Sequence, residues 1–266
     1  NTYFTIFIRN SSINIRMKDI FRANTSYFPY IQAVSTATFI YMLFQAVPLQ
    51  WWLLSIAMYF LTGCLGITIT FHRYLTHKSF KFRYKWMEYL FSFFGAIGGT
   101  GSSIGWVAVH NEHHKNADQP GDPHAPHNGF WNVIIPKYDF DMNKWAVRSL
   151  ITNKFHLALH NYYYLILLVW FALLFFVGGL NVLIFAGIIP VAFQIWASVL
   201  SNYGNHSWGY RNFITKEDSR NTWWLAAITW GEGWHNNHHA KPGKWNFQYK
   251  WWELDPSAWV IRLVKI

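Results

Sequence analysis

The histidines of this chain are the residues whose number and spacing point most directly to chemistry. The sequence contains 13 histidines among 266 residues. The pattern His-x-x-His-His occurs twice, at His110, His113 and His114 and at His235, His238 and His239. Positions i, i+3 and i+4 of a helix lie on one face, so each segment is expected to point three imidazoles the same way. Neutral imidazole is a good ligand for Zn, Cu, Fe and Ni, so both segments predict metal binding.

Three more histidines extend this set. His72 and His77 are five residues apart, and His206 follows Asn202 by four residues. On a regular helix His72 and His77 do not share a face. Their rings can converge only if the helix ends there or if they serve different metals. A tetrahedral zinc site needs four ligands, whereas these clusters hold nine histidines, which fits two metals of higher coordination number.

Two other classes of metalloenzyme are disfavoured by the sequence. The zinc-protease motif His-Glu-x-x-His is absent. A carboxylate di-iron bundle needs two Glu-x-x-His pairs and two further glutamates, and only Glu232 and His235 form such a pair. We expect Asp118, Asp122 and Glu232 instead to orient ligand imidazoles from behind, as carboxylates often do at metal sites.

Two long segments without charged residues must position these clusters. Hydrophobic residues make up 52% of the chain and charged residues only 13%, whereas a typical soluble domain has about 25% charged residues. No Asp, Glu, Lys or Arg occurs in residues 23–72 or 155–210. A helix needs about 20 apolar residues to cross a bilayer, so each segment has room for a hairpin of two spans. The predicted spans are 28–46 and 51–71, with a turn at 48–50, and 160–177 and 182–201, with a turn at 178–181.

The distribution of Lys and Arg predicts the orientation in the membrane. Four lie before the first span, ten between the hairpins and eight after the last span, and the hairpin tips hold none. Positive residues favour the cytoplasmic side, so both termini and the middle loop are expected there. The net charge of +10 is then explained without nucleic acid as a partner. A glycine-rich, charge-free segment, 89–111, is expected to form an interfacial or re-entrant helix pair with a break.

These features predict an all-α, multi-pass integral membrane protein with a single domain, 1–266. Four transmembrane helices, arranged as two hairpins, are expected to carry a cytosolic helical cap formed by 72–159 and 202–266. The cap holds the histidine-rich dimetal site on the cytoplasmic face. The single cysteine, Cys64, excludes a disulfide scaffold, and the high apolar content excludes disorder.

The histidine motifs resemble those of the integral-membrane fatty acyl desaturases, and most closely those of the acyl-CoA delta-9 (stearoyl-CoA) group. That family shows His-Arg-x-x-x-His, His-x-x-His-His and His-Asn-x-His-His in this order. Here the three motifs are 72–77, 110–114 and 235–239. The family's Asn-x-x-x-His element is also present, from Asn202 to His206, and the resemblance covers roughly residues 28–266.

The resemblance implies an oxygen-dependent di-iron enzyme of fatty acid biosynthesis. With O2 as co-substrate and two electrons, such an enzyme removes two vicinal hydrogens from a long-chain acyl thioester and leaves a cis double bond, at delta-9 in the subgroup. No catalytic residue beyond the metal ligands is implied, and Asn202 is expected to reach one metal through a water. The implied ligands of the two iron ions are His72, His77, His110, His113, His114, His206, His235, His238 and His239.

The sequence leaves the acyl carrier open. In animal acyl-CoA desaturases, polar and basic residues just before the second motif hold the CoA head group. Trp106 fits this pattern, but the basic position holds Ala108. The acyl chain is therefore carried by CoA, acyl carrier protein or a lipid. No cytochrome b5 or rubredoxin module is fused to the chain, so we expect a separate electron donor such as cytochrome b5 or ferredoxin. An acidic donor would suit the basic cytosolic face.

Two alternatives stay open. A hydroxylase, acetylenase or decarboxylase of acyl chains could share this architecture, because the position of the chain relative to the oxidant decides the product. A non-catalytic membrane metal-binding or transport protein is more remote. A transporter would place ionisable residues deep inside its spans, and the predicted spans hold no Asp, Glu, Lys or Arg.

Overall fold

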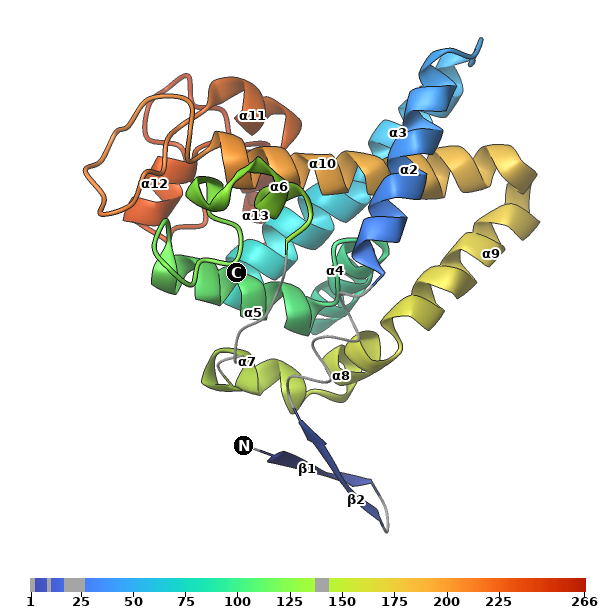
Figure 1. Cartoon of the computed structure of the whole chain (residues 1–266), viewed down its shortest axis with the longest axis horizontal. Coiled ribbons are helices and arrows are strands. Elements are labelled where there is room, and N and C mark those ends of the chain that lie inside the picture. The colour runs from blue at the N-terminus through green and yellow to red at the C-terminus, as the bar shows by residue number, and fades with distance from the viewer. Residues whose placement is uncertain (1–2, 9–10, 17–26, 137–143) are drawn as a thin grey trace.

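The computed structural model describes residues 3–8, 11–16, 27–136 and 144–266. At the N-terminal end, strands β1 (Tyr3–Ile8) and β2 (Ser11–Arg16) form an antiparallel hairpin. From residue 27 onward, the described elements are all helices, joined by loops that contain isolated bridges (Figure 1). The helical fold expected from the sequence is therefore present, with a two-stranded hairpin in front of it.

Two helical hairpins occupy the two charge-free segments. In the first, α2 (Phe28–Leu43) is followed by α3 (Leu49–Tyr59), which continues directly into η1 (Phe60–Thr76). The turn predicted at 48–50 lies slightly earlier, at 44–48, because Pro48 lacks an N–H and stands directly before the first residue of α3. In the second, α9 (Tyr163–Val182) passes into η3 (Leu183–Ile188) and α10 (Ile189–Gly204).

The turn of the second hairpin is a sharp bend at two glycines. Gly178 and Gly179 have non-helical backbone angles, with φ of −152° and 66°. The positive φ of Gly179 favours glycine, because a Cβ would crowd the backbone there. At this bend, on the right of Figure 1, the chain turns back from α9 toward α10.

Two helical segments, the second with the glycine bend inside it, are long and apolar enough to cross a membrane. They are Leu49–Thr76 and Tyr163–Gly204, with mean hydropathies of 1.8 and 2.5. In the most apolar part of Tyr163–Gly204, only 11% of the residues are buried inside the protein. A helix that shows apolar side chains to the outside on this scale suits a lipid environment. The structure thus contains two candidate membrane helices, and the four-span topology stays a prediction because α2 has only 16 residues.

The remaining helices form a cap around the ends of η1 and α10. In the glycine-rich segment, α4 (Lys85–Ile97) and α5 (Ser103–Asn116) form the expected helix pair, with its break at 98–102. Figure 1 shows α11 and α12 at the end of α10 that lies away from the glycine bend. The further cap helices are η2 (Pro126–Asn128), α6 (Phe130–Ile134), α7 (Lys144–Ile151), α8 (Lys154–Asn161), α11 (Trp223–Ile228), α12 (His235–Ala240) and α13 (Pro256–Val264).

Close packing fixes the position of η1, which carries the first histidine motif. A Cβ added to Gly66 of η1 would lie only 2.3 Å from the backbone nitrogen of Gly95 in α4, so the two helices meet through their backbones. The fully buried Phe71, five residues after Gly66 in η1, lies against the same Gly95 and also packs in a core with Ile104 of α5. The two helices that carry the first and second histidine motifs are therefore held against each other.

Candidate metal centre

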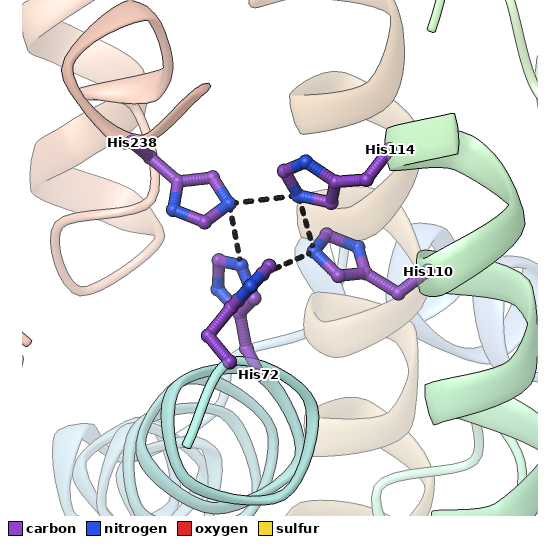
Figure 2. Close-up of side chains that lie close together, drawn as sticks. His72, His110, His114 and His238 are labelled. Carbon is purple, nitrogen blue, oxygen red and sulfur yellow. Dashed lines mark hydrogen bonds between the residues drawn. The ribbon is translucent and has the colours of Figure 1, made fainter. Parts of the chain in front are cut away.

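Five of the nine clustered histidines meet in one group. Ring nitrogens of His72, His77, His110, His114 and His238 lie within 4.8 Å of one another. The Nε2 atoms of His72 and His238 are 3.0 Å apart, as are those of His110 and His114. Figure 2 shows the labelled rings, which come from η1, α5 and α12, pointing toward a common centre. Helices far apart in the sequence build this five-histidine group together.

The other four histidines form a second group next to the first. His113, His206, His235 and His239 place ring nitrogens within 4.8 Å of one another. The Nε2 atoms of His206 and His235 are 3.1 Å apart. The rings of His114 and His239, one from each group, stack with their centroids 4.4 Å apart. The structure thus contains two adjacent nitrogen-rich sites rather than scattered rings.

Each His-x-x-His-His segment contributes to both groups, which corrects the expectation that its three rings act together. His110 and His114, at positions i and i+4, enter the five-histidine group, whereas His113, at i+3, enters the four-histidine group. The motif 235–239 divides in the same way, with His238 separated from the other two. The reason is geometric, because i+3 and i+4 lie on opposite sides of i around the helix axis. One motif therefore spans two sites.

His72 and His77 converge because the helix that carries them is wider than an α-helix. The backbone of η1 follows the i to i−5 bonding pattern of a π-helix, and the His77 N–H donates to the His72 carbonyl at 3.1 Å. This winding brings residues five apart onto nearly the same side, and the helix ends at Thr76. Both rings belong to one group, which favours convergence on one site over the alternative that they serve different metals.

The chemistry of these donors suits metal cations. Burial, followed by the neighbouring imidazoles, lowers the pKa of His110 and His238 well below the usual value for histidine. The rings are therefore neutral at neutral pH, and a neutral imidazole carries one N–H and one lone pair. Inward-facing lone pairs only 3.0 Å apart repel each other, and a cation between them removes this repulsion. Two groups of this kind fit two metal ions.

Carboxylates lie behind three of the rings. All three were singled out from the sequence, and each contacts the Nδ1 atom of a different histidine. A hydrogen on Nδ1 that points to a carboxylate leaves the Nε2 lone pair free to face the centre of the group. The contacts are His72 with Glu232 at 2.5 Å, His113 with Asp122 at 3.0 Å and His206 with Asp118 at 2.7 Å.

A fourth carboxylate, Glu217, was missed by sequence reasoning. Its Oε1 atom lies 3.2 Å from Nδ1 of His239. Glu217 belongs to the loop after α10, and no spacing relates it to a histidine motif. In the sequence Glu217 stands between two other charged residues, Lys216 and Asp218. Such charged segments are usual on protein surfaces, so nothing in the sequence marks Glu217 as part of the site.

Arg73, which follows the first histidine of its motif, is fully buried behind the site. Its guanidinium donates to Glu232 at 3.2 Å and to Asp255 at 2.7 Å, and it lies 3.8 Å from the ring centre of Phe247. Burial raises the pKa of Glu232 to about 8, and the positive charge of Arg73 acts in the opposite direction. The arginine therefore favours the ionised carboxylate that accepts from His72.

An apolar cavity of about 180 Å³ reaches both histidine groups. Its wall includes His72 and His110 from the first group and His235 from the second, together with Asn202 and Trp106. The Trp106 ring stacks on His110 with centroids 4.8 Å apart. A mostly apolar space whose wall includes histidines of both groups suits an alkyl chain better than a polar ligand. The rest of its wall includes Phe28, Ile67, Val109, Val133, Ile134, Ile195 and Val199.

Histidines outside the family motifs have other partners. His124 stacks on His113 with centroids 4.5 Å apart and forms a third cluster with His113 and Asp122. His156 and His160 are buried and hydrogen-bond through Nδ1 to serines at the start of α5. These contacts join helices of the cap.

The sequence matches a known protein family over most of its length. Residues 49–263 match the family model described as "Fatty acid desaturase". An "sn-2 palmitoyl-lipid 9-desaturase" of Nostoc sp. (strain 36) is 36% identical over 222 residues, covering 80% of this chain and 77% of that protein. An "sn-1 stearoyl-lipid 9-desaturase" of Anabaena variabilis is 32% identical over 255 residues, covering 91% of this chain and 93% of that protein.

A third relative comes from a plant. A chloroplastic "palmitoyl-monogalactosyldiacylglycerol delta-7 desaturase" of Arabidopsis thaliana is 35% identical over 245 residues, covering 88% of this chain and 66% of that protein. All three relatives are named for acyl chains carried by lipids. They differ in this from the acyl-CoA group that the histidine motifs indicated.

Proposed function

This chain belongs to the fatty acid desaturase family, and we propose that it places a cis double bond at delta-9 of a long, lipid-linked acyl chain. Family membership makes it an oxidoreductase of lipid metabolism. In the proposed reaction, –CH2–CH2– becomes –CH=CH–, and one O2 with two electrons and two protons becomes two waters. One observation carries this proposal: two buried histidine groups meet at the wall of one apolar cavity.

We infer that the acyl carrier is a membrane lipid rather than CoA. The relatives reported above are named for lipid substrates. In addition, the position where animal acyl-CoA enzymes hold a basic residue is Ala108, which is only 4% exposed and packs in the core between η1 and α5. The buried methyl group of Ala108 carries no charge and cannot bind the phosphate groups of CoA. A lipid-linked chain reaches a membrane enzyme from the bilayer without leaving its apolar surroundings.

We further propose that the five-histidine group and the four-histidine group each hold one iron ion. Imidazole is a suitable ligand for iron, and Asn202 in the cavity wall is the residue expected to reach one ion through a water. Bound iron would supply the activation of dioxygen. The protein's own part is to hold the neutral rings, through the carboxylates behind them, and to keep the alkyl chain in a space lined by apolar side chains.

The same proposal places four spans in the membrane. Helices lie in all four charge-free span segments, and the lysines and arginines lie outside both hairpin tips. With the tips across the membrane, the cap and both histidine groups would face the cytoplasm. A soluble electron donor could then reach the histidine groups while the acyl chain enters from the lipid.

Expression in a host that lacks the product tests the function. We expect mass spectrometry of total lipids to show new mono-unsaturated chains with the double bond at carbon nine. His110→Ala should abolish them, because it removes a ring that belongs to the five-histidine group and lines the cavity. His127→Ala is the matched control, since His127 is exposed and belongs to neither of the two histidine groups. Hydroxylated chains or terminal alkenes, found in place of a double bond at carbon nine, would contradict the proposed desaturation.

A further inference from the structure

The loop between α10 and α11 exposes an apolar side chain at its tip. The Ile214 side chain is fully exposed, with a relative exposure of 102%. The loop is held in place from both sides, because the Asn236 side chain accepts hydrogen bonds from the backbone N–H groups of Asn212 and Phe213, both at 2.9 Å. Arg211 donates to the backbone of the same loop as well. Ile214 is therefore presented by a fixed loop.

Positive charges lie in the same loop and in the segment 244–250, which packs on the loop through Tyr249. Arg211 and Lys216 of the same loop are exposed. Phe213 packs on Tyr249 with centroids 4.7 Å apart, and the Lys244 ammonium lies 4.0 Å from the centre of the same tyrosine ring. Two more exposed residues, Lys250 and Trp251, follow Tyr249. We call this set the loop surface: Arg211, Ile214, Lys216, Lys244, Tyr249, Lys250 and Trp251.

The carboxylates near the loop surface do not cancel its charge. Glu217 is turned toward His239. Glu253 is fully buried and accepts hydrogen bonds from the backbone N–H groups of Tyr249 and Lys250. Asp218 is exposed, and its backbone N–H donates to Asp118. In the part of the chain that the structure describes, the loop surface thus presents four exposed cations, and Asp218 is the exposed carboxylate of the same loop, which favours an acidic partner.

The same loop touches the four-histidine group. Glu217 contacts Nδ1 of His239 at 3.2 Å. The backbone N–H of Asp218 donates to Asp118 at 2.8 Å, and Asp118 in turn contacts Nδ1 of His206 at 2.7 Å. One or two non-covalent contacts thus connect the loop to two rings of the four-histidine group.

We propose that the loop surface is the docking site of a small acidic protein that delivers electrons one at a time. This inference rests on the desaturase function proposed above. The carrier that docks on this surface supplies the two electrons that each turnover consumes. Two reduced carrier molecules are oxidised in sequence, and their electrons, with two protons from solvent, go to the O2 that becomes two waters. Ile214 provides an apolar anchor, and the cations of the loop surface select and steer the carrier.

A protein partner fits this position better than a membrane surface. The loop surface lies at the α12 end of the molecule, on the left of Figure 1, whereas the bend between α9 and α10 lies on the right. The loop is also fixed to histidines of the candidate metal centre, where electrons are needed. A membrane-binding surface needs no such connection.

The test separates electron delivery from chemistry. The iron-loaded protein in nanodiscs is given a lipid-linked acyl substrate and either a protein donor or dithionite followed by O2. The protein donor is the better of reduced ferredoxin and reduced cytochrome b5. We expect Ile214→Glu combined with Lys244→Glu to lower the donor-supported rate at least tenfold and to leave the product formed with dithionite unchanged. Lys154→Glu, an exposed charge reversal on α8, is the matched control and should retain the wild-type rate.

Rising ionic strength should lower the wild-type rate with the protein donor and have little effect on the double variant, because salt screens attraction between exposed charges. An unchanged donor-supported rate in the double variant would overturn the docking site, as would an equal loss of product with dithionite. If neither carrier supports product formation by the wild type, while dithionite does, the proposal of an acidic protein partner is overturned. Lost binding to anionic vesicles at an unchanged donor-supported rate would identify a membrane surface instead. Absence of product with dithionite in the wild type would reject the desaturase function itself.

Discussion

At the scale of single residues, the carboxylates behind the histidines decide which ring nitrogen faces the centre of each group. Four rings have Nδ1 against a carboxylate, so the lone pair of Nε2 points inward. For His72 this carboxylate is Glu232, which also accepts from the buried Arg73. A change at Glu232 therefore alters both the tautomer of a ring and the partner of a buried charge.

Glu232→Gln should lower the metal affinity 10- to 100-fold, the range usual for groups that orient a ligand from behind. Glutamine keeps the shape and one acceptor, but it cannot take up the negative charge that Arg73 favours. Metal per purified chain and competition with a chelator measure the effect. Glu112→Gln is the matched control, because Glu112 lies in the second motif but binds Lys115 and Asn116. Equal affinities in the two variants would rule out an orienting role for Glu232.

The sequence predicted much of the candidate site because spacing on a helix is a local property. The nine histidines that meet in two groups were all identified from their motifs. Their division between the groups was not predicted: i+3 and i+4 lie on opposite sides of i around the helix axis, but which of them shares a group with i depends on the rings that the other helices supply. Glu217 could not be predicted at all, since its contact with His239 comes from the folding of a loop that has no periodic pattern.

At the scale of elements, one buried carboxylate connects four helices of the cap. Glu88 of α4 accepts from Tyr74 of η1 at 2.5 Å and from Lys85 at 2.7 Å, and it contacts Nε2 of His156 in α8 at 3.2 Å. Nδ1 of His156 lies 2.9 Å from the Ser103 hydroxyl at the start of α5. This network fixes the helices that carry the first and second histidine motifs.

The network gives a pH-dependent stability. Burial alone would raise the pKa of Glu88, but hydrogen bonds from His156, Lys85 and Tyr74 lower it from 4.5 to about 2. A carboxyl with a depressed pKa in the folded state stabilises the protein above about pH 4.5, and this contribution, about 3 kcal/mol, is lost as the pH falls toward 2. Glu88→Gln mimics the protonated state at every pH.

We therefore expect Glu88→Gln to lower the Tm in nanodiscs by roughly 5–10 °C at pH 7. The difference from the wild type should shrink as the pH falls from 4.5 to 3. Glu112→Gln again serves as control, because its carboxylate binds the exposed Lys115 and the change should be small at all pH values. A Tm difference between wild type and Glu88→Gln that stays constant down to pH 3 would contradict the assignment.

The helices themselves were predictable, whereas the winding of η1 was not. Long charge-free runs predicted helices at 28–46, 51–71, 160–177 and 182–201, and each is present with ends shifted by a few residues. The π-type helix η1 packs closely on α4, where the backbone of Gly66 meets that of Gly95. Hydrophobic periodicity of a fully apolar segment contains no information about such contacts.

At the scale of the whole molecule, composition predicted the arrangement of the cap better than its partners. The charge distribution predicted that every histidine cluster lies on one side of the membrane, and in the structure the nine clustered histidines form two adjacent groups. Their side of the membrane stays a prediction. The acyl carrier was harder to predict. Ala108 in place of a basic residue is an argument against CoA, but it does not show which other carrier is used. Only the lipid substrates named for the relatives point further.

The four-span topology can be tested with single cysteines. Cys64 is the chain's only cysteine and is fully buried, so Cys64→Ser provides a background for labelling. We expect Gln45→Cys and Leu180→Cys, at the two hairpin tips, to react with a membrane-impermeant maleimide from one side of sealed vesicles. Ile214→Cys, on the loop after α10, should react only from the other side. All three positions are exposed, so a lack of labelling cannot be caused by burial inside the protein.

The side from which each position reacts distinguishes the possible arrangements. If both hairpins cross the bilayer completely, the two tips lie together on the face away from the histidine groups, as the lack of Lys and Arg at the tips requires. If α2 and α3 only dip into the bilayer, Gln45→Cys reacts from the same side as Ile214→Cys. Only Leu180→Cys, next to the bend at 178–179, then reacts from the opposite side. Labelling of all three positions from one side would contradict the four-span arrangement, and with it the entry of the acyl chain from within the bilayer.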